Sequence, residues 1–159
     1  MSTEHHYELT VEWTGNRGAG TANYRAYGRD HDVRRDGKPT TIAGTADPTF
    51  RGDPERWNPE ELLVASLSQC HMLWFLHLAA VADVVVTEYV DTPVGTLTLD
   101  KSDGSGQFTE VVLRPSITVT DESMITKIER LHERAAEKCF IARSVNFPVG
   151  HQAETRVAS

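Results

Sequence analysis

The chain has few of the features that most readily reveal a function. Among its 159 residues there are only two cysteines, and the formal net charge of −7 leaves basic residues in the minority. An acidic chain has no general electrostatic attraction for nucleic acid or for anionic membranes. Its longest apolar stretches are broken by Ser, Gln, His or Asp, and no basic segment followed by an apolar run opens the sequence. We therefore expect a cytoplasmic protein that binds neither nucleic acid nor a membrane.

The sequence also contains no repeat and no low-complexity block. Its length fits one domain, residues 1–159, with a real hydrophobic core, although a chain this short gains from dimer formation. Reducing systems keep cytoplasmic thiols reduced, so a permanent disulfide between Cys70 and Cys139 is not expected. If the two cysteines pair, we expect them to be a redox couple.

A central helix is the clearest local prediction. Asn58-Pro59-Glu60-Glu61 supplies an N-cap, a proline at the first helical position and, in Glu61, a carboxylate three residues after the cap. Apolar residues continue to Ala82 and cover most of the helix circumference, so this helix is expected in the centre of the fold. A second helix should begin at Asp121 and carry Cys139 on its apolar face.

The remaining segments favour extended structure. Alternating apolar and polar residues, separated by turns rich in Gly, Asp and Ser, predict antiparallel strands both before and after the central helix in the sequence. The predicted segments are strands over 7–46 with an extended stretch from Thr21 to Val33, a loop over 47–57, the central helix over 58–82, strands over 84–120, the second helix over 121–142 and a tail over 143–159. Two helices are too few for a parallel sheet, and the pattern indicates an α+β fold.

Each cysteine has a histidine seven residues away, Cys70 with His77 and Cys139 with His132. Seven helical residues rise by about 10.5 Å, so neither pair can hold one ion from a straight helix, and no metal site or cofactor is expected. We interpret these histidines as core or interface imidazoles. His71 lies about 100° round the helix from Cys70, which leaves a role in tuning the thiol open. From the residues alone, the cysteines are either inert core residues or a redox pair.

The order and spacing of several short motifs are more specific than any one of them. The motifs are Trp13-x-Gly15, Arg17-Gly18-x-Gly20-Thr21, the Asn-Pro-Glu-Glu-Leu helix start, the ten residues from Glu60 to Cys70, and a second helix with Ala135, Ala136 and Cys139. Together they resemble the OsmC/Ohr family of thiol peroxidases over nearly the whole chain. Phe140 stands where much of the family has proline, which places the chain in an outlying OsmC-like branch.

The resemblance implies a two-cysteine peroxidase that reduces organic hydroperoxides in oxidative-stress defence. Cys70 would be the attacking thiolate, which becomes a sulfenic acid, and Cys139 would be the resolving thiol that forms a disulfide with it. An external dithiol would then open the disulfide. For this family, the resemblance implies a lipoyl-type reductant. Leu73 and Trp74 would supply apolar surface for the organic substrate.

The resemblance also implies a cation for Cys70, because a thiol in an apolar pocket stays protonated without one. In the family this cation is an arginine held by a glutamate. Glu60 matches the glutamate, and Arg17 and Arg51 are equal candidates for the arginine. Ten helical residues rise by about 15 Å between Glu60 and Cys70, so either the helix bends near Ser66 to Ser68 or Glu60 acts through the arginine.

The fold implied by the resemblance is an intertwined homodimer in which strands of both chains wrap the central helices. The alternative function is a small hydrophobic ligand-binding or redox-sensing protein of the same fold, without peroxidase turnover. A third interpretation, a structural or interaction protein, predicts neither peroxide reactivity nor a pocket.

Overall fold

The computed structural model describes residues 1–159, which divide into two compact units, residues 1–62 and 63–159. Each unit is described by itself. The strands are β1 (Thr10–Trp13), β2 (His31–Arg34), β3 (Ile42–Gly44), β4 (Val86–Asp91), β5 (Val94–Leu99), β6 (Gly106–Leu113), β7 (Pro115–Val119), β8 (Val149–His151) and β9 (Glu154–Val157). The helices are α1 (Pro59–Val81) and α2 (Ile125–Lys138), with short 3-10 helices at Pro48–Phe50, Glu122–Met124 and Ala142–Ser144.

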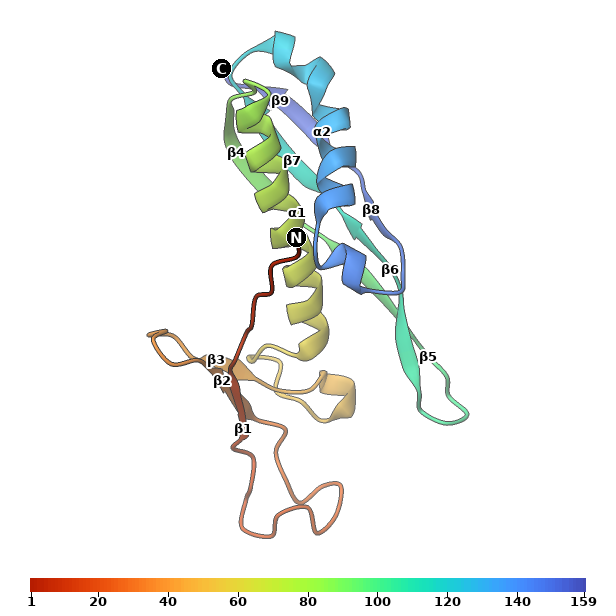
Figure 1. Ribbon diagram of the computed structural model, residues 1–159. Coiled ribbons are helices and arrows are strands. Elements are labelled where there is room, and N and C mark those ends of the chain that lie inside the picture. Colours follow the sequence, from red (N-terminus) through yellow and green to blue (C-terminus); the bar gives the residue numbers. More distant parts are fainter. The chain divides into compact units, whose positions relative to one another are not determined.

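The strands of the first unit form the expected antiparallel meander, in the order β1-β2-β3 (Figure 1). They are shorter than the patterns predict, because most of the stretch from Thr21 to Val33 forms bends and turns. Arg29 holds these turns with its guanidinium over the rings of Tyr24 and Tyr27, 4.5 and 3.9 Å from the ring centroids. The two tyrosines, which favour a strand by type, are therefore used for cation–π contacts.

A close approach of two backbones explains the Trp13-x-Gly15 motif. The amide of Gly28 donates to the carbonyl oxygen of Gly15 at 2.8 Å, and the indole of Trp13 donates to the carbonyl oxygen of Gly28 at 2.9 Å. A Cβ atom on Gly15 would lie 2.0 Å from that oxygen of Gly28. Position 15 therefore accepts only glycine without moving the backbone.

α1 begins as the sequence predicts. The Asn58 side chain accepts a hydrogen bond from the Glu61 amide at 2.8 Å, and the Glu61 carboxylate accepts one from the Asn58 amide at 3.1 Å. This is the reciprocal capping box. The helix then continues without a break to Val81, within one residue of the predicted bounds 58–82. Asp83 follows in a left-handed conformation, with φ of 57°, where the chain turns toward β4.

The second unit contains two three-stranded sheets, in the orders β4-β7-β9 and β5-β6-β8. The pairs β4·β7 and β5·β6 are antiparallel, as expected. The tail departs from that expectation, because β8 pairs with β6 and β9 pairs with β7 in parallel. Each tail residue pairs with the residue 38 positions earlier, from Val111 with Val149 to Val119 with Val157. The intervening helix α2 carries the chain back to the side where β6 begins (Figure 1).

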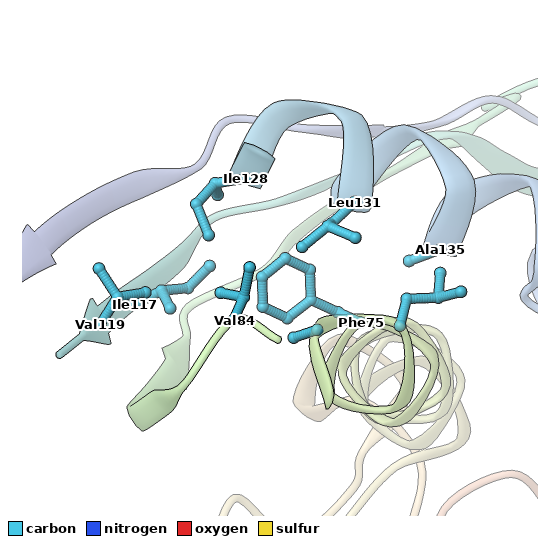
Figure 2. Packing of buried hydrophobic residues seen from close by; sticks show 9 residues of the cluster. Phe75, Val84, Ile117, Val119, Ile128, Leu131 and Ala135 are labelled. Atoms are coloured by element: carbon cyan, nitrogen blue, oxygen red, sulfur yellow. The ribbon is translucent and has the colours of Figure 1, made fainter. Parts of the chain in front are cut away.

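The main core of the second unit lies between α1, α2 and the sheet β4-β7-β9. The two helices run side by side in opposite directions (Figure 1). Phe75 of α1 is fully buried, and its ring points between Leu131 of α2 and Val84 (Figure 2). Burying an apolar side chain of this size contributes about 1.5–3 kcal/mol to stability. The buried members of this cluster are Phe75, Leu78, Ala79, Val84, Ile117, Val119, Ile128, Leu131 and Ala135.

α2 is shorter than the predicted helix over 121–142. Asp121 accepts a hydrogen bond from the Ser123 amide at 2.8 Å and caps a 3-10 turn, after which the α-helix runs from Ile125 to Lys138. Cys139 then has an extended backbone, with φ of −61° and ψ of 113°. Neither glycine nor proline marks this end, so the apolar pattern overruns it. Cys139 therefore caps α2 and does not lie inside it.

Candidate active site

The two cysteines come from different elements of the second unit and meet. Cys70 lies in the middle of α1 and is half-buried, whereas Cys139, at the end of α2, is 1% exposed. Both are free thiols. Cys70 lies near enough to Cys139 to raise the pKa of the Cys139 thiol. Packing of the two helices thus joins residues that are far apart in the sequence.

Cys139 is held in a state that keeps its proton at neutral pH. Burial raises the pKa of the Cys139 thiol to about 11, and the neighbouring Cys70 contributes in the same direction. The Ala142 amide, 3.4 Å from the sulfur, opposes this shift by donating a hydrogen bond. A thiol with so high a pKa is rarely a thiolate, so Cys139 is poorly suited to attack a substrate first.

The apolar side chains nearest to Cys70 along α1 are only partly covered. The half-buried ring of Trp74 meets Phe140 edge-on, with the centroids 5.6 Å apart. Leu73 is 60% exposed and Phe140 is 67% exposed. The predicted pocket residues Leu73 and Trp74 therefore border a surface on this chain and do not enclose a cavity.

His77 is exposed, so it is not a core imidazole. Its ring meets the edge of Trp74, with the centroids 5.8 Å apart. The reason is its position on α1, because His77 shares an exposed stripe with Leu73 and Val81, at helical spacings of four. His132, in contrast, is buried, which agrees with the expectation of a core imidazole, and His71, for which no burial was predicted, is buried as well.

The three residues expected to supply charge belong to the first unit. Arg17 is exposed, in the loop where Asn16 accepts hydrogen bonds from two glycine amides. Arg51 is also exposed and has a left-handed backbone, with φ of 67°. One carboxylate oxygen of Glu60, in the first turn of α1, is buried without a hydrogen-bond partner. Neither Arg17 nor Arg51 forms an ion pair with Glu60.

Three other arginines of the first unit already have partners, whereas Arg25 and Arg35 form no ion pair. Arg29 lies over two tyrosine rings, and Arg34 pairs with Glu12. Arg56 donates to the carbonyl oxygen of Gly44 at 2.9 Å and forms further bonds to β2. Arg17 and Arg51 form no ion pair, so both remain available for a ligand or a second chain.

Sequence reasoning misses a polar network on another face of α1. The Ser68 hydroxyl donates to the Asp91 carboxylate at 2.5 Å, and the Arg114 amide donates to the same carboxylate at 2.6 Å. Burial, followed by the charge of Asp91, raises the pKa of Tyr89, whose buried hydroxyl has no hydrogen-bond partner. The only signal in the sequence is a serine and a glutamine within an apolar helix.

This network borders a pocket of about 470 Å³ between α1 and β4. The lining residues are Ala65, Ser68, Gln69, Met72, Tyr89, Asp91 and Pro93. Cys70 is not among them. The pocket is therefore separate from the meeting point of the two cysteines.

By length and composition alone, α1 could cross a membrane. Within this chain, 28% of its most apolar 18-residue stretch is buried. Core helices of soluble proteins meet the same test. In this fold α1 packs on α2 and on two sheets through Phe75 and Leu67. Its apolar composition is therefore used for packing.

Comparison with known proteins identifies the family. Residues 52–153 match the family described as OsmC-like protein, a range that includes Glu60, Cys70 and Cys139. No curated protein matches at a significant level. The solved structure of an OsmC-like protein of unknown function from Vibrio cholerae is 34% identical, with a TM-score of 0.82 over 94% of this chain and 99% of that one.

Structures with lower identity share the fold. An organic hydroperoxide resistance protein from Elizabethkingia anophelis is 18% identical, with a TM-score of 0.70 over 97% of this chain and 100% of that one. The organic hydroperoxide resistance protein OhrB from Bacillus subtilis is also 18% identical, with a TM-score of 0.60 over 94% and 96% of the two chains. Taken with the meeting of the two cysteines and the α+β architecture, these matches show that the chain belongs to the OsmC-like protein family.

Proposed function

We propose that this chain is a cytoplasmic thiol peroxidase that reduces organic hydroperoxides. The observation that carries the proposal is the proximity of a half-buried Cys70 to a buried Cys139 whose thiol has a raised pKa. This asymmetry suits an attacking and a resolving thiol. The names of the hydroperoxide resistance proteins that share the fold support a peroxide as the substrate class.

The proposed reaction takes place in two steps at these sulfurs. The Cys70 thiolate attacks the terminal oxygen of the hydroperoxide, an S–O bond forms, the O–O bond breaks, and the alkoxide leaves and takes a proton to become an alcohol. Cys139 then gives up its proton and attacks the Cys70 sulfenic acid, which forms the disulfide and releases water. An external dithiol, proposed to be of the lipoyl type, reduces the disulfide and is itself oxidised to a disulfide.

The first step needs a positive charge to favour the Cys70 thiolate. On the family resemblance, we assign this role to Arg17 or Arg51 and assign Glu60 to hold the arginine. Two observations support the assignment. Both arginines lack an ion pair, and Glu60 has a buried carboxylate oxygen that still lacks a donor. A buried acceptor of this kind favours a donor in the working protein.

The working protein is proposed to be a homodimer. Less than a third of the most apolar stretch of α1 is buried within the chain. On the exposed stripe of α1, Leu73 and Val81 present apolar side chains to solvent. Large exposed apolar faces mark interaction sites. A second copy covering this stripe would also enclose the side chains of Leu73 and Trp74 next to Cys70, where the organic part of the substrate is proposed to bind.

We expect Leu73→Glu to convert the dimer to monomers, because a carboxylate on the covered stripe would lose its hydration without gaining a partner. The measurement is the molar mass in solution by light scattering after size exclusion. Thr126→Glu adds the same charge to an exposed site on α2 and serves as the matched control. A dimer that persists in Leu73→Glu would remove this stripe from the interface.

The direct test of the proposed function is a count of free thiols after peroxide treatment. We expect one equivalent of cumene hydroperoxide to consume both thiols of each reduced chain and to leave an intrachain Cys70–Cys139 disulfide, as identified by mass spectrometry of the peptides. Reduced protein in buffer alone is the control. Retention of both thiols would contradict the peroxidase function.

The second candidate is a protein that binds a small hydrophobic ligand or senses redox state. The pocket between α1 and β4 favours it, because Met72, Ala65 and Pro93 give the pocket apolar walls and the Tyr89 hydroxyl lacks a partner. Such a protein would bind its ligand without turning over peroxide. The thiol count therefore separates the two candidates.

A further inference from the structure

A pair of buried histidines joins α1 to α2. Nε2 of His71 and Nδ1 of His132 are 2.9 Å apart, and their ring planes differ by 6°. His71 is 2% exposed and His132 is 0% exposed. This hydrogen bond is therefore isolated from water. In the core, its direction and length are well defined.

The rings around His132 hold it in place. Phe75 of α1 stacks on it with the centroids 4.2 Å apart, and His151 of β8 lies on it at 5.3 Å. His151 is itself fixed by a bond from its Nε2 to the Glu129 carboxylate at 2.9 Å. Phe75 occupies the centre of the apolar cluster between the helices (Figure 2). His132 has little freedom to change its position.

The second nitrogen of His132, Nε2, is buried and has no partner. An unpaired acceptor is better tolerated in a core than an unpaired N–H group. The favoured tautomer of His132 therefore carries its proton on Nδ1 and donates it to Nε2 of His71. Because one ring nitrogen remains unsatisfied, an apolar residue would suit this core at least as well for stability alone.

A buried polar pair that is not needed for stability can serve to fix one register between two elements. Apolar side chains tolerate small slides and rotations of a helix, whereas a buried hydrogen bond does not. His71 is the residue after Cys70, and His132 lies on the helix that ends at Cys139. A rotation of α1 that broke the histidine bond would also move Cys70, because the two residues share one turn of helix.

We propose that His71 and His132 are positioning residues, whose hydrogen bond sets the register of α1 on α2 in which Cys139 meets Cys70. The pair acts on disulfide formation and not on the attack of Cys70 on peroxide. The second part of this statement rests on the proposed peroxidase function, whereas the effect on the Cys70–Cys139 disulfide does not.

Three variants separate register from stability. His132→Phe keeps a flat ring against Phe75 but removes the hydrogen bond. His132→Asn places an amide N–H near the position of Nδ1 and so retains a donor toward His71. Leu131→Ala, at the neighbouring core position, leaves both histidines intact but removes buried core packing, and it is the matched control for destabilisation.

The first measurement needs no peroxide. The fraction of Cys70–Cys139 disulfide is determined in buffers of reduced and oxidised dithiothreitol, with folded protein confirmed by circular dichroism. We expect His132→Phe to lower the disulfide equilibrium constant by about tenfold or more, because small misplacements of reacting groups are costly. His132→Asn should recover part of this loss, and Leu131→Ala should match the unchanged protein. A normal constant in His132→Phe, or an equal fall in Leu131→Ala, would overturn the proposal.

The second measurement divides the reaction into its steps. In stopped flow with cumene hydroperoxide, His132→Phe should oxidise Cys70 at the unchanged rate but form the disulfide about tenfold more slowly, so that sulfenic acid accumulates and can be trapped with dimedone. Equal slowing of both steps would contradict a positioning role. If even the unchanged protein ignores peroxide, the proposed function fails, while the dithiothreitol equilibrium still decides the role of the histidines.

Discussion

Cys70→Ser is expected to lose peroxide turnover by about a thousandfold or more, to the level of the protein-free reaction. A serine hydroxyl stays protonated at neutral pH and cannot displace an alkoxide from the O–O bond, whereas a thiolate can. Cys139 cannot replace Cys70, because burial, the main cause of its raised pKa, is unchanged in the variant and keeps the Cys139 thiol protonated at pH 7. The measurement is the loss of cumene hydroperoxide at saturating dithiol.

Cys139→Ser is the partner variant for this prediction. It should consume one equivalent of peroxide per chain at the unchanged rate and then stop as the Cys70 sulfenic acid, which dimedone traps. Turnover should persist only as far as the external dithiol reduces the sulfenic acid directly. Full activity in Cys70→Ser would contradict the assigned roles. So would a slower oxidation of Cys70 by peroxide in Cys139→Ser than in the unchanged protein.

Acidification from pH 7 to pH 4.5 is expected to lower the free energy of unfolding by roughly 5 kcal/mol, a large part of the stability of a domain of this size. Burial, and then the charge of His151, lowers the pKa of His71 from 6.5 to about 4, although Asp91 opposes the shift. Burial, and then His71 and His151, lowers the pKa of His132 to about 3. In the unfolded chain both titrate near 6.5.

The sign follows from the number of protons bound. Between pH 6.5 and about 4 the unfolded chain binds more protons than the folded chain at these two sites, so stability rises with pH in that window. The contribution is complete above pH 6.5 and is lost as the pH falls. Urea unfolding at pH 7, 5.5 and 4.5 measures it, and these values stay above the range in which hydrogen-bonded Asp100 and Asp121 are protonated.

His132→Phe should show a smaller pH dependence over the same window, because it lacks one of the two buried bases. A second measurement does not depend on the variant. Proton NMR of the imidazole ring hydrogens should show His71 and His132 neutral at pH 5.5. Protonation of both buried rings near pH 6.5 would contradict the prediction.

The features that could be predicted from the sequence are those with a local cause. The capping box at Asn58 and Glu61 depends on four consecutive residues, and its two hydrogen bonds are present. The burial of His132 follows from its place on an apolar stripe of the second helix. The family resemblance rested on motif spacing, and the match over residues 52–153 confirms it.

The features that could not be predicted depend on distant partners. Tyr24 and Tyr27 favour a strand by type but bind Arg29, and no local rule reports that contact. Cys139 ends α2 although no stop signal is present: its amide still donates to the carbonyl oxygen of Ala135, as in a helix, but its backbone is extended and its sulfur accepts a hydrogen bond from the Ala142 amide. Tertiary contacts override local propensity at such positions.

The histidines show the same division between local and distant causes. The pattern identifies His132 as a candidate for the core, but its hydrogen bond to His71 joins residues 61 positions apart. His77 lies on the same helix and is exposed. Periodicity alone could not say which stripe of an almost wholly apolar helix faces α2, because every side of α1 carries apolar residues.

The parallel pairing of β8 and β9 makes the second unit difficult to unfold in parts. Both strands pair with partners 38 residues earlier, and α2 lies within that span, so neither sheet has its third strand until the helix has docked. Contacts of such long range form late and cooperatively. Amide hydrogens of α2, β8 and β9 should therefore exchange with solvent through one common opening event, and the buried Cys139 would become accessible only when that whole assembly opens.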